Sequence, residues 1–260
     1  MINLSSFETL FDDNYKVYDM VRPEYPQKLF NDILEYKPLV KTSRIMEIGI
    51  GTGKATQFFI DYGCQIASVE PGPKMAKFVR NKYKDYDDFS CYNMTFEKYM
   101  GMNNTFDLIY SATAFHWLDQ NIAFEKSFKL LKSNGALARF AYHAGKDTAN
   151  PELMTEIDKL YAEYMPGDKD YKPYSENAAK NAALLACDYG FTDIQYKTYN
   201  FEKNFTADEY VKLLSTYPDH MRLSEEIRKE FFSKIKKTIL KFGNKITINY
   251  FVDLQLARKP

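Results

Sequence analysis

This chain of 260 residues contains few cysteines and has a formal net charge of zero, and each of these features excludes a class of protein. The three cysteines lie far apart, at positions 64, 91 and 187, so they form neither a close-spaced metal pair nor an even disulfide framework. The 35 basic and 35 acidic residues cancel. No basic field is therefore available to hold nucleic acid, and we expect a small molecule as the partner and no metal site.

Long apolar runs are also missing. The sequence contains no secretory signal segment and no stretch that is long enough to cross a bilayer. The cysteine usage is typical of a reducing compartment, so we expect a cytoplasmic protein without a membrane partner. With 45% hydrophobic residues, the chain can bury the core of one large α/β domain with insertions. Nothing in the sequence indicates an oligomeric state.

Strand-like and helix-like segments alternate over the first half of the chain, as in a parallel sheet that is covered by helices on both faces. Strands are predicted at 44–48, 65–70, 89–92, 106–110 and 136–142. Helices are predicted at 54–62, 73–84 and 121–131, the last of them ending in a Ser133-Asn-Gly135 turn.

The regular alternation stops near residue 143. The segments predicted after it are a turn-rich loop at 165–173, helices at 151–164 and 176–189, a strand at 193–199, two helices within 206–241 and a last strand at 245–257. A Thr206-Ala-Asp-Glu209 capping box opens the first of those two helices.

We predict a single domain over residues 1–260. Its parts are an N-terminal segment at about 1–40, a core of alternating strands and helices at about 41–143, insertions at about 144–185 and 200–244, and last strands at 191–199 and 245–257.

The most informative segment is the run Ile45-Met-Glu-Ile-Gly-Ile-Gly-Thr-Gly53, in which a predicted strand ends in three glycines. Glu70 ends the next predicted strand. This pattern is typical of a nucleoside-binding βαβ unit, with exposed backbone at the turn and an acid for the ribose. The glycines at 49, 51 and 53 follow at spacing two, which does not match the G-x-G-x-x-G that a dinucleotide needs.

Glu47, just before the glycines, offers a negative charge to a ligand that carries an ammonium group. With these residues the chain resembles the class I S-adenosylmethionine-dependent methyltransferases, whose first motif reads acidic-x-G-x-G-x-G and whose second is the acid ending the second strand. The resemblance implies S-adenosyl-L-methionine as the cofactor. It implies cofactor contacts at Glu47, Gly49, Gly51, Gly53 and Glu70.

The same resemblance implies a fold. Its members have a Rossmann-like, seven-stranded and mostly parallel sheet whose seventh strand is antiparallel, with helices on both faces. Helical segments between the last strands cover the substrate. We expect this α/β architecture over nearly the whole chain.

Thr95 and Phe96 follow the third predicted strand, at the end of the sheet where ligands bind in such folds. Similar methyltransferases often have an aspartate at the Thr95 position for the adenine amino group. The resemblance implies that the hydroxyl of Thr95 and the amide of Phe96 take these adenine contacts.

The segment Ser111-Ala-Thr-Ala-Phe-His-Trp117 follows the fourth predicted strand. It resembles a methyltransferase subgroup that includes the trans-aconitate methyltransferases, in which a small pair precedes aromatic-His-Trp. In that subgroup Ser111 and Ala112 would let the backbone approach the methionine part of the cofactor. Phe115, His116 and Trp117 would lie beside the transferable methyl group. Together with Tyr142, the last residue of the fifth predicted strand, and His143, which follows it, they would form the substrate side.

The run Tyr18-Asp-Met-Val-Arg22-Pro-Glu-Tyr25-Pro26 resembles the Tyr-x-x-x-Arg-Pro-x-Tyr-Pro segment of the same subgroup. The resemblance implies that it lies over the cofactor, with Tyr18 facing the substrate. Arg22 would be available for a carboxylate of the cofactor or of an acidic substrate, because a guanidinium presents a matching fork.

These residues predict in-line transfer of a methyl group to a small acceptor. A carboxylate acceptor is already ionised and needs no base, whereas a hydroxyl or an amine would use His116 as the base. Arg22 and Arg222 favour an acidic acceptor. The strand-four segment lacks the Asn/Asp-Pro-Pro-aromatic run of enzymes that methylate base amines.

The sequence also allows purely structural roles for several of these residues, and other functions for the chain. Tyr18 and Tyr25 suit ordinary packing, Arg22 suits a surface ion pair, and His116 suits a structural role. A non-catalytic, regulatory protein that binds S-adenosylmethionine is an alternative function. An NAD-dependent oxidoreductase is a less favoured one, because its glycine fingerprint is missing.

Overall fold

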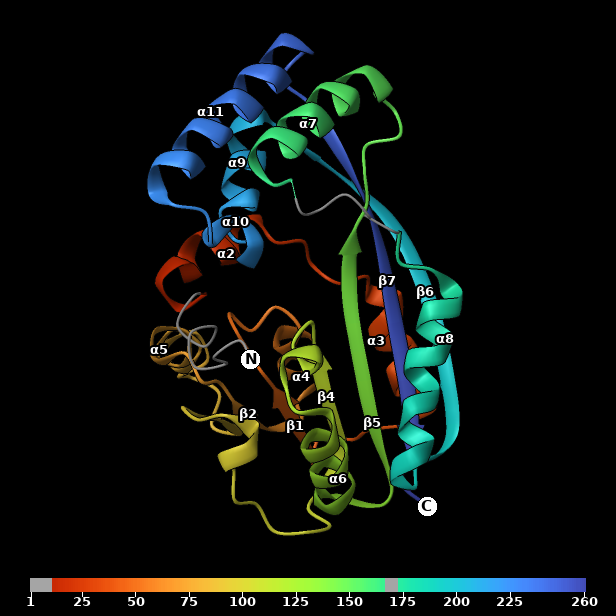
Figure 1. The fold of residues 1–260 in the computed structure, drawn as a ribbon. Coiled ribbons are helices and arrows are strands. Elements are labelled where there is room, and N and C mark those ends of the chain that lie inside the picture. The colour runs from red at the N-terminus through yellow and green to blue at the C-terminus, as the bar shows by residue number, and fades with distance from the viewer. Residues whose placement is uncertain (1–10, 167–172) are drawn as a thin grey trace. The chain divides into compact units, whose positions relative to one another are not determined.

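The computed structural model describes residues 11–166 and 173–260, and a seven-stranded sheet forms its centre (Figure 1). The strands follow the order β3-β2-β1-β4-β5-β7-β6. Their bounds are β1 Arg44–Ile48, β2 Gln65–Val69, β3 Phe89–Tyr92, β4 Phe106–Ala112, β5 Leu131–Ala144, β6 Thr192–Phe205 and β7 Ile246–Arg258.

The first five strands are parallel. Strand β1 lies between β2 and β4, with Met46 opposite both Ala67 and Ile109. The end of β7 runs antiparallel to the start of β5, where the N–H of Asn134 donates to the Lys259 carbonyl at 2.8 Å and the Lys259 N–H donates to Gly135 at 2.9 Å. The prediction of a mostly parallel sheet with an antiparallel seventh strand is confirmed.

Helices fill the connections between the strands. Several begin at a side chain that accepts an N–H of the first turn, as the Thr206–Glu209 capping box does. Their bounds are α2 Tyr15–Val21, α3 Gln27–Tyr36, α4 Thr56–Tyr62, α5 Pro73–Lys82, α6 Gln120–Leu130, α7 Pro151–Tyr164, α8 Glu176–Leu184, α9 Ala207–Leu214, α10 Pro218–Met221 and α11 Glu225–Lys241. Short 3-10 turns lie at Asp12–Asn14, Phe96–Lys98, Phe115–Trp117 and Leu185–Tyr189.

The described chain divides into two compact units. Unit 1 contains the described residues of Met1–Pro23, His143–Tyr174 and Asn200–Phe251. Unit 2 contains Glu24–Tyr142, Ser175–Tyr199 and Val252–Pro260. The expected arrangement of one domain with cover segments stays a prediction.

Unit 2 is built around the central strands. In β1 every residue after Arg44 is buried, as expected of a parallel strand that is covered on both faces. Met46 and Ile109 are fully buried in one apolar cluster together with Phe124 of α6. This cluster therefore packs against β1 and β4, the two strands that lead into the turns described below.

Unit 1 is largely helical. Helix α11 packs against α7 and α9 (Figure 1). At this contact the buried ring of Phe231 meets Tyr161 edge-on, with ring centroids 5.1 Å apart, and stacks on Tyr164 at 5.2 Å. Aromatic packing thus forms the core of this unit.

Four sequence-based boundaries were wrong. The Ser133–Gly135 turn lies inside β5, which begins directly after α6, because the backbone at 134–135 pairs with Lys259. Strand β6 continues to Phe205. The other two segments divide further than predicted: 176–189 becomes α8 and a 3-10 turn, and 206–241 becomes three helices, since Pro218 starts α10 and Ser224 caps α11.

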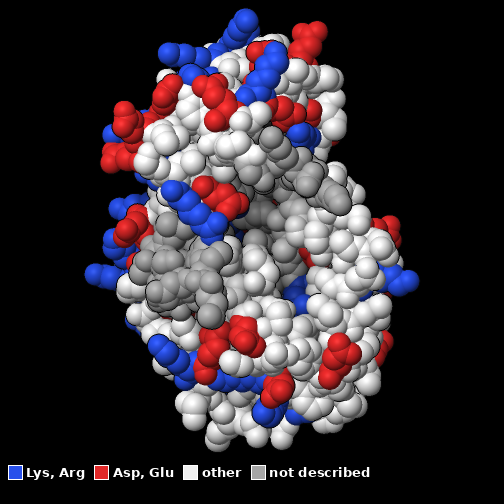
Figure 2. Space-filling model, in the orientation of Figure 1, with Lys and Arg blue, Asp and Glu red and all other residues white. Residues whose placement is uncertain are grey.

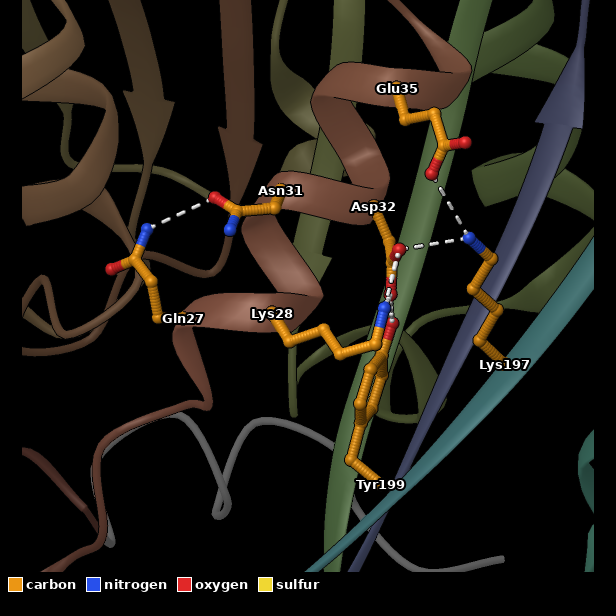
Figure 3. A network of polar contacts seen from close by, with 7 residues as sticks. All are labelled: Gln27, Lys28, Asn31, Asp32, Glu35, Lys197 and Tyr199. Atoms are coloured by element: carbon orange, nitrogen blue, oxygen red, sulfur yellow. Dashed lines mark hydrogen bonds and ion pairs between the residues drawn. The ribbon is translucent and has the colours of Figure 1, made fainter.

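A polar network joins α3 to β6 within unit 2 (Figure 3). The buried carboxylate of Asp32 accepts hydrogen bonds from Tyr199 at 2.7 Å, Lys197 at 2.9 Å and Lys28 at 3.1 Å. Burial raises the pKa of Asp32, but the hydrogen bonds outweigh it and lower the pKa. The ionised carboxylate therefore holds α3 on the sheet, and with it the Tyr25-Pro26 segment that leads into α3.

Charged side chains of both signs are interspersed on the face of the molecule drawn in Figure 2. Among residues 11–166 and 173–260, no helix is long and apolar enough to span a membrane. Within the same two ranges, no group of three or more His, Cys, Asp or Glu side chains is placed to hold a metal ion.

Candidate functional site

The glycine turn follows β1 in unit 2, and its three glycines differ in their surroundings. All have positive φ, which favours glycine. A Cβ on Gly49 would lie 2.6 Å from the Cβ of Ala114, and one on Gly53 would lie 2.9 Å from the ring of Tyr83. Of the three glycines, only Gly51 has no described residue within 4 Å of an added Cβ. Among the described residues, Gly51 is therefore the point where the turn presents bare backbone.

Glu70 follows β2 and is held against this turn. Its side chain is 6% exposed. One carboxylate oxygen accepts the N–H of Gly51 at 2.8 Å, and the other accepts the N–H of Gly72 at 2.9 Å. A carboxylate has about four lone-pair sites, so Glu70 can accept further hydrogen bonds from a ligand at the same place.

Glu47 lies in β1, two residues before Gly49, and its side chain is buried. Its Oε2 accepts hydrogen bonds from the hydroxyls of Thr56 at 2.5 Å and Tyr110 at 2.7 Å. Burial raises the pKa of Glu47 to about 8, although both hydrogen bonds act to lower it, and the charge of Glu70 raises it further. At neutral pH the carboxyl is therefore mostly protonated, and a nearby cation would favour its ionised form.

A second turn follows β4 and carries the predicted small pair. The hydroxyl of Ser111 donates to the carbonyl of Ile48 at 3.0 Å, which ties the end of β4 to the end of β1. The side chain of Phe115 is buried, whereas His116 and Trp117 are exposed, with ring centroids 4.9 Å apart. The two strand-end turns thus meet at one edge of the sheet.

Thr95 and Phe96 lie at the start of a 3-10 turn after β3. The ring of Phe96 is buried in the core cluster, so only its backbone is available to a ligand. The side-chain amide of Asn93 donates to the carbonyls of Glu70 and Pro71, both at 2.9 Å. Asn93 thus connects the end of β3 to Glu70 and Pro71, a role that sequence reasoning did not find.

Sequence reasoning also missed a contact between Tyr25 and Thr113. Their hydroxyls are hydrogen-bonded at 2.6 Å, although 88 positions separate them in the chain. The ring of Tyr25 lies 5.5 Å from that of Tyr142. The one available signal was the position of Tyr25 in the Arg-Pro-x-Tyr-Pro run, since Thr113 carries no spacing signal of its own.

Tyr18, Arg22 and His143 belong to unit 1. The Arg22 guanidinium donates to the hydroxyl of Thr216 at 2.9 Å and to its carbonyl at 2.6 Å. It also lies 5.0 Å from the ring of Tyr18 and 4.2 Å from that of Tyr217. The contacts of these residues with a cofactor or a substrate stay predictions.

His143 lines a cavity of about 460 Å³ in unit 1. Its ring stacks on Tyr174 at 3.6 Å, and Phe251 and Glu202 line the same cavity. Arg222, the other cation named for an acidic acceptor, is half exposed and paired with Asp219 at 3.3 Å.

Comparison with known proteins gives a consistent result. Residues 46–138 match the model of a family described as a methyltransferase domain. The chain is 26% identical over 247 residues to an "uncharacterized methyltransferase-like" protein of Schizosaccharomyces pombe, covering 94% of this chain and 90% of that protein. It is 28% identical over 173 residues to a "probable S-adenosylmethionine-dependent methyltransferase" of Saccharomyces cerevisiae, which spans 65% of this chain and 57% of that one.

The fold is similar to that of a solved structure from Anaeromyxobacter dehalogenans, described as a "Putative Type II Methyltransferase". The TM-score is 0.64 at 17% identity, over 92% of this chain and 98% of that one.

Proposed function

Because the chain belongs to the class I S-adenosylmethionine-dependent methyltransferases, we propose that it transfers a methyl group to a small-molecule acceptor. The turn after β1, Glu70 and the turn after β4 form the cofactor site in this proposal. All three lie in unit 2.

The observation that carries the proposal is the contact between Glu70 and Gly51. It places an acidic acceptor beside the one glycine of the turn whose added Cβ would meet no described residue within 4 Å. A ribose offers two hydroxyl donors, which suit the remaining lone pairs of Glu70. The residues present therefore fit a nucleoside. Glu47 fits the ammonium group of the methionine part of S-adenosylmethionine.

S-adenosylmethionine supplies a methyl group on a sulfonium, which is an excellent leaving group. The protein then has to align the acceptor and exclude water. Trp117 of unit 2 is exposed and supplies aromatic surface for this purpose, because aromatic faces attract a positive charge. Phe115 and Tyr142 of unit 2 are buried, and their contact with the substrate stays a prediction. The backbone around Ala112 allows a close approach because its side chain is small.

For the acceptor we propose a carboxylic acid. The proposal follows the sequence, in which Arg22 and Arg222 favour an acidic acceptor. Both arginines belong to unit 1, where the Tyr18 and Tyr217 rings and Thr216 hold Arg22 in one orientation. A carboxylate reacts without a base. Replacing His116 by Ala therefore leaves turnover on a carboxylic acid nearly unchanged, and it lowers turnover on a hydroxyl or amine by about 10²- to 10⁴-fold.

The test is a screen for transfer of a labelled methyl group to acidic, phenolic and amine metabolites. We expect label in a carboxylic acid, and about ten- to a hundredfold less of it when Glu70 is replaced by Ala and the cofactor is kept below its dissociation constant. The matched control is Glu125→Ala, which removes a carboxylate from the exposed face of α6. Label that enters only phenols or amines would overturn the carboxylic acid, and label that enters only added protein or nucleic acid would overturn the small acceptor.

A further inference from the structure

Thr113 has an unusual backbone conformation at a functional position. It follows the small pair at the end of β4 and has φ +55°. A β-branched residue rarely adopts this left-handed region, because its side chain crowds the backbone. Such strain persists only where the surroundings over-determine it, and it collects at functional sites.

Two hydrogen bonds hold this strained residue, and its neighbour Ala114 makes a third contact. The N–H of Thr113 donates to the carbonyl of Phe140 at 2.7 Å, and its hydroxyl is hydrogen-bonded to that of Tyr25 at 2.6 Å. The next residue, Ala114, presses against the glycine turn so closely that a Cβ on Gly49 would clash with it. The turn after β4, residues 113–117, which we call the strand-four turn, is therefore fixed between Tyr25 and the glycine turn.

Tyr25 is itself held firmly. Its ring packs edge-on against Phe140 at 4.9 Å and lies against Tyr142. The preceding residue, Glu24, forms an ion pair of 2.5 Å with Lys54, the residue after the last glycine of the turn. The Glu24-Tyr25 pair thus contacts both turns of the proposed cofactor site, and every residue involved belongs to unit 2.

We propose that Tyr25 and Thr113 are positioning residues, whose hydroxyl pair holds the strand-four turn where His116 and Trp117 face the cofactor. The proposal rests on the proposed function, since the turn matters only if it borders the cofactor. Neither residue is assigned a contact with the reacting atoms. Both act through the 3-10 turn at Phe115–Trp117.

The chain contains its own probe for this claim. Trp117 is its only tryptophan, it lies four residues after Thr113, and it is 37% exposed. The quenching of its emission by acrylamide therefore reports how the turn is held, in the absence of any ligand.

The test compares Tyr25→Phe and Thr113→Val, which each remove one hydroxyl, with the double variant. A hydrogen bond of ordinary net strength corresponds to about a fivefold change in affinity. We expect each single variant to bind S-adenosylhomocysteine about fivefold more weakly and to show stronger quenching of Trp117. The double variant should bind S-adenosylhomocysteine as well as each single variant does, because all three variants remove the same hydrogen bond.

Two further variants separate positioning from simple packing. Thr113→Ser keeps the hydroxyl and should restore both the affinity and the quenching. Tyr86→Phe removes a comparable hydrogen bond, from its hydroxyl to the Cys64 carbonyl at 2.8 Å, elsewhere in unit 2. It should change neither readout.

If Tyr25→Phe and Thr113→Val behave like Tyr86→Phe in both measurements, the positioning role is wrong. If the wild-type protein itself does not bind S-adenosylhomocysteine, the proposed cofactor site fails instead. In that case unchanged quenching of Trp117 in the two variants also shows that the hydroxyl pair does not hold the turn. Increased quenching upholds the contact between the hydroxyl pair and the turn, but overturns its role in cofactor binding.

Discussion

Cofactor binding should depend steeply on pH, because the carboxyl proposed to meet the ammonium is mostly protonated in the unliganded protein. Burial raises the pKa of Glu47 to about 8. By that value, about 1% of the protein carries an ionised Glu47 at pH 6 and about half carries it at pH 8. If the ammonium binds only the carboxylate, affinity rises about 50-fold over this interval.

The assay is calorimetric titration with S-adenosylhomocysteine at pH 6, 7 and 8. Repeating it in buffers with different ionisation enthalpies measures the proton that Glu47 releases on binding. Glu47→Gln keeps the shape and an acceptor for Thr56 and Tyr110, but it cannot ionise. We expect this variant to bind weakly with a flat pH profile, and Glu125→Gln to retain the wild-type slope.

The same shift affects folding. A carboxyl whose pKa is raised in the folded state contributes stability below its unfolded value, near 4.5, and this contribution is lost as the pH rises through about 8. Glu47→Gln should therefore weaken the decline in stability between pH 5 and pH 8. Equal pH slopes for wild type and Glu47→Gln, in binding and in unfolding, would refute the role given to Glu47.

The remaining predictions concern the turn glycines and the acid beside them. Gly51→Ala adds a methyl group at a residue with φ +57° and should lower the unfolding free energy by about 1–2 kcal/mol through backbone strain alone, while it weakens S-adenosylhomocysteine binding at least tenfold. Gly53→Ala combines the same backbone strain with a clash against Tyr83 and should lower the unfolding free energy by about 2–5 kcal/mol in a urea titration; the opposite order of the two stabilities would contradict the geometry of the turn. Glu70→Ala should weaken the same binding by about ten- to a hundredfold, since it removes a hydrogen bond to a charged group, and an unchanged affinity would remove Glu70 from the site.

Much of the sheet was predictable because each of its strands has a local signal. The mostly apolar segment before Gly49 and the acid at Glu70 predicted the first two strands to within a residue. The Thr206–Glu209 capping box likewise gave a helix start that the structure confirms. Periodicity and capping act over a few residues, so they can be read without the fold.

Other features depend on partners that are distant in sequence. Residues Ser133–Gly135 belong to a strand because their backbone pairs with Lys259, whereas their local sequence predicts a turn. The Tyr25–Thr113 contact and the attachment of Asp32 to Lys197 and Tyr199 are likewise long-range. No spacing rule within one chain reveals such pairs, which is why the site was predicted by its motifs and not by its supports.

Titration of the folded wild-type protein with S-adenosylhomocysteine tests the central claim most directly. The account predicts a single site at pH 8 that is weakened by Glu70→Ala and unaffected by Glu125→Ala. Absence of binding to a protein with an intact, cooperative unfolding transition would contradict it.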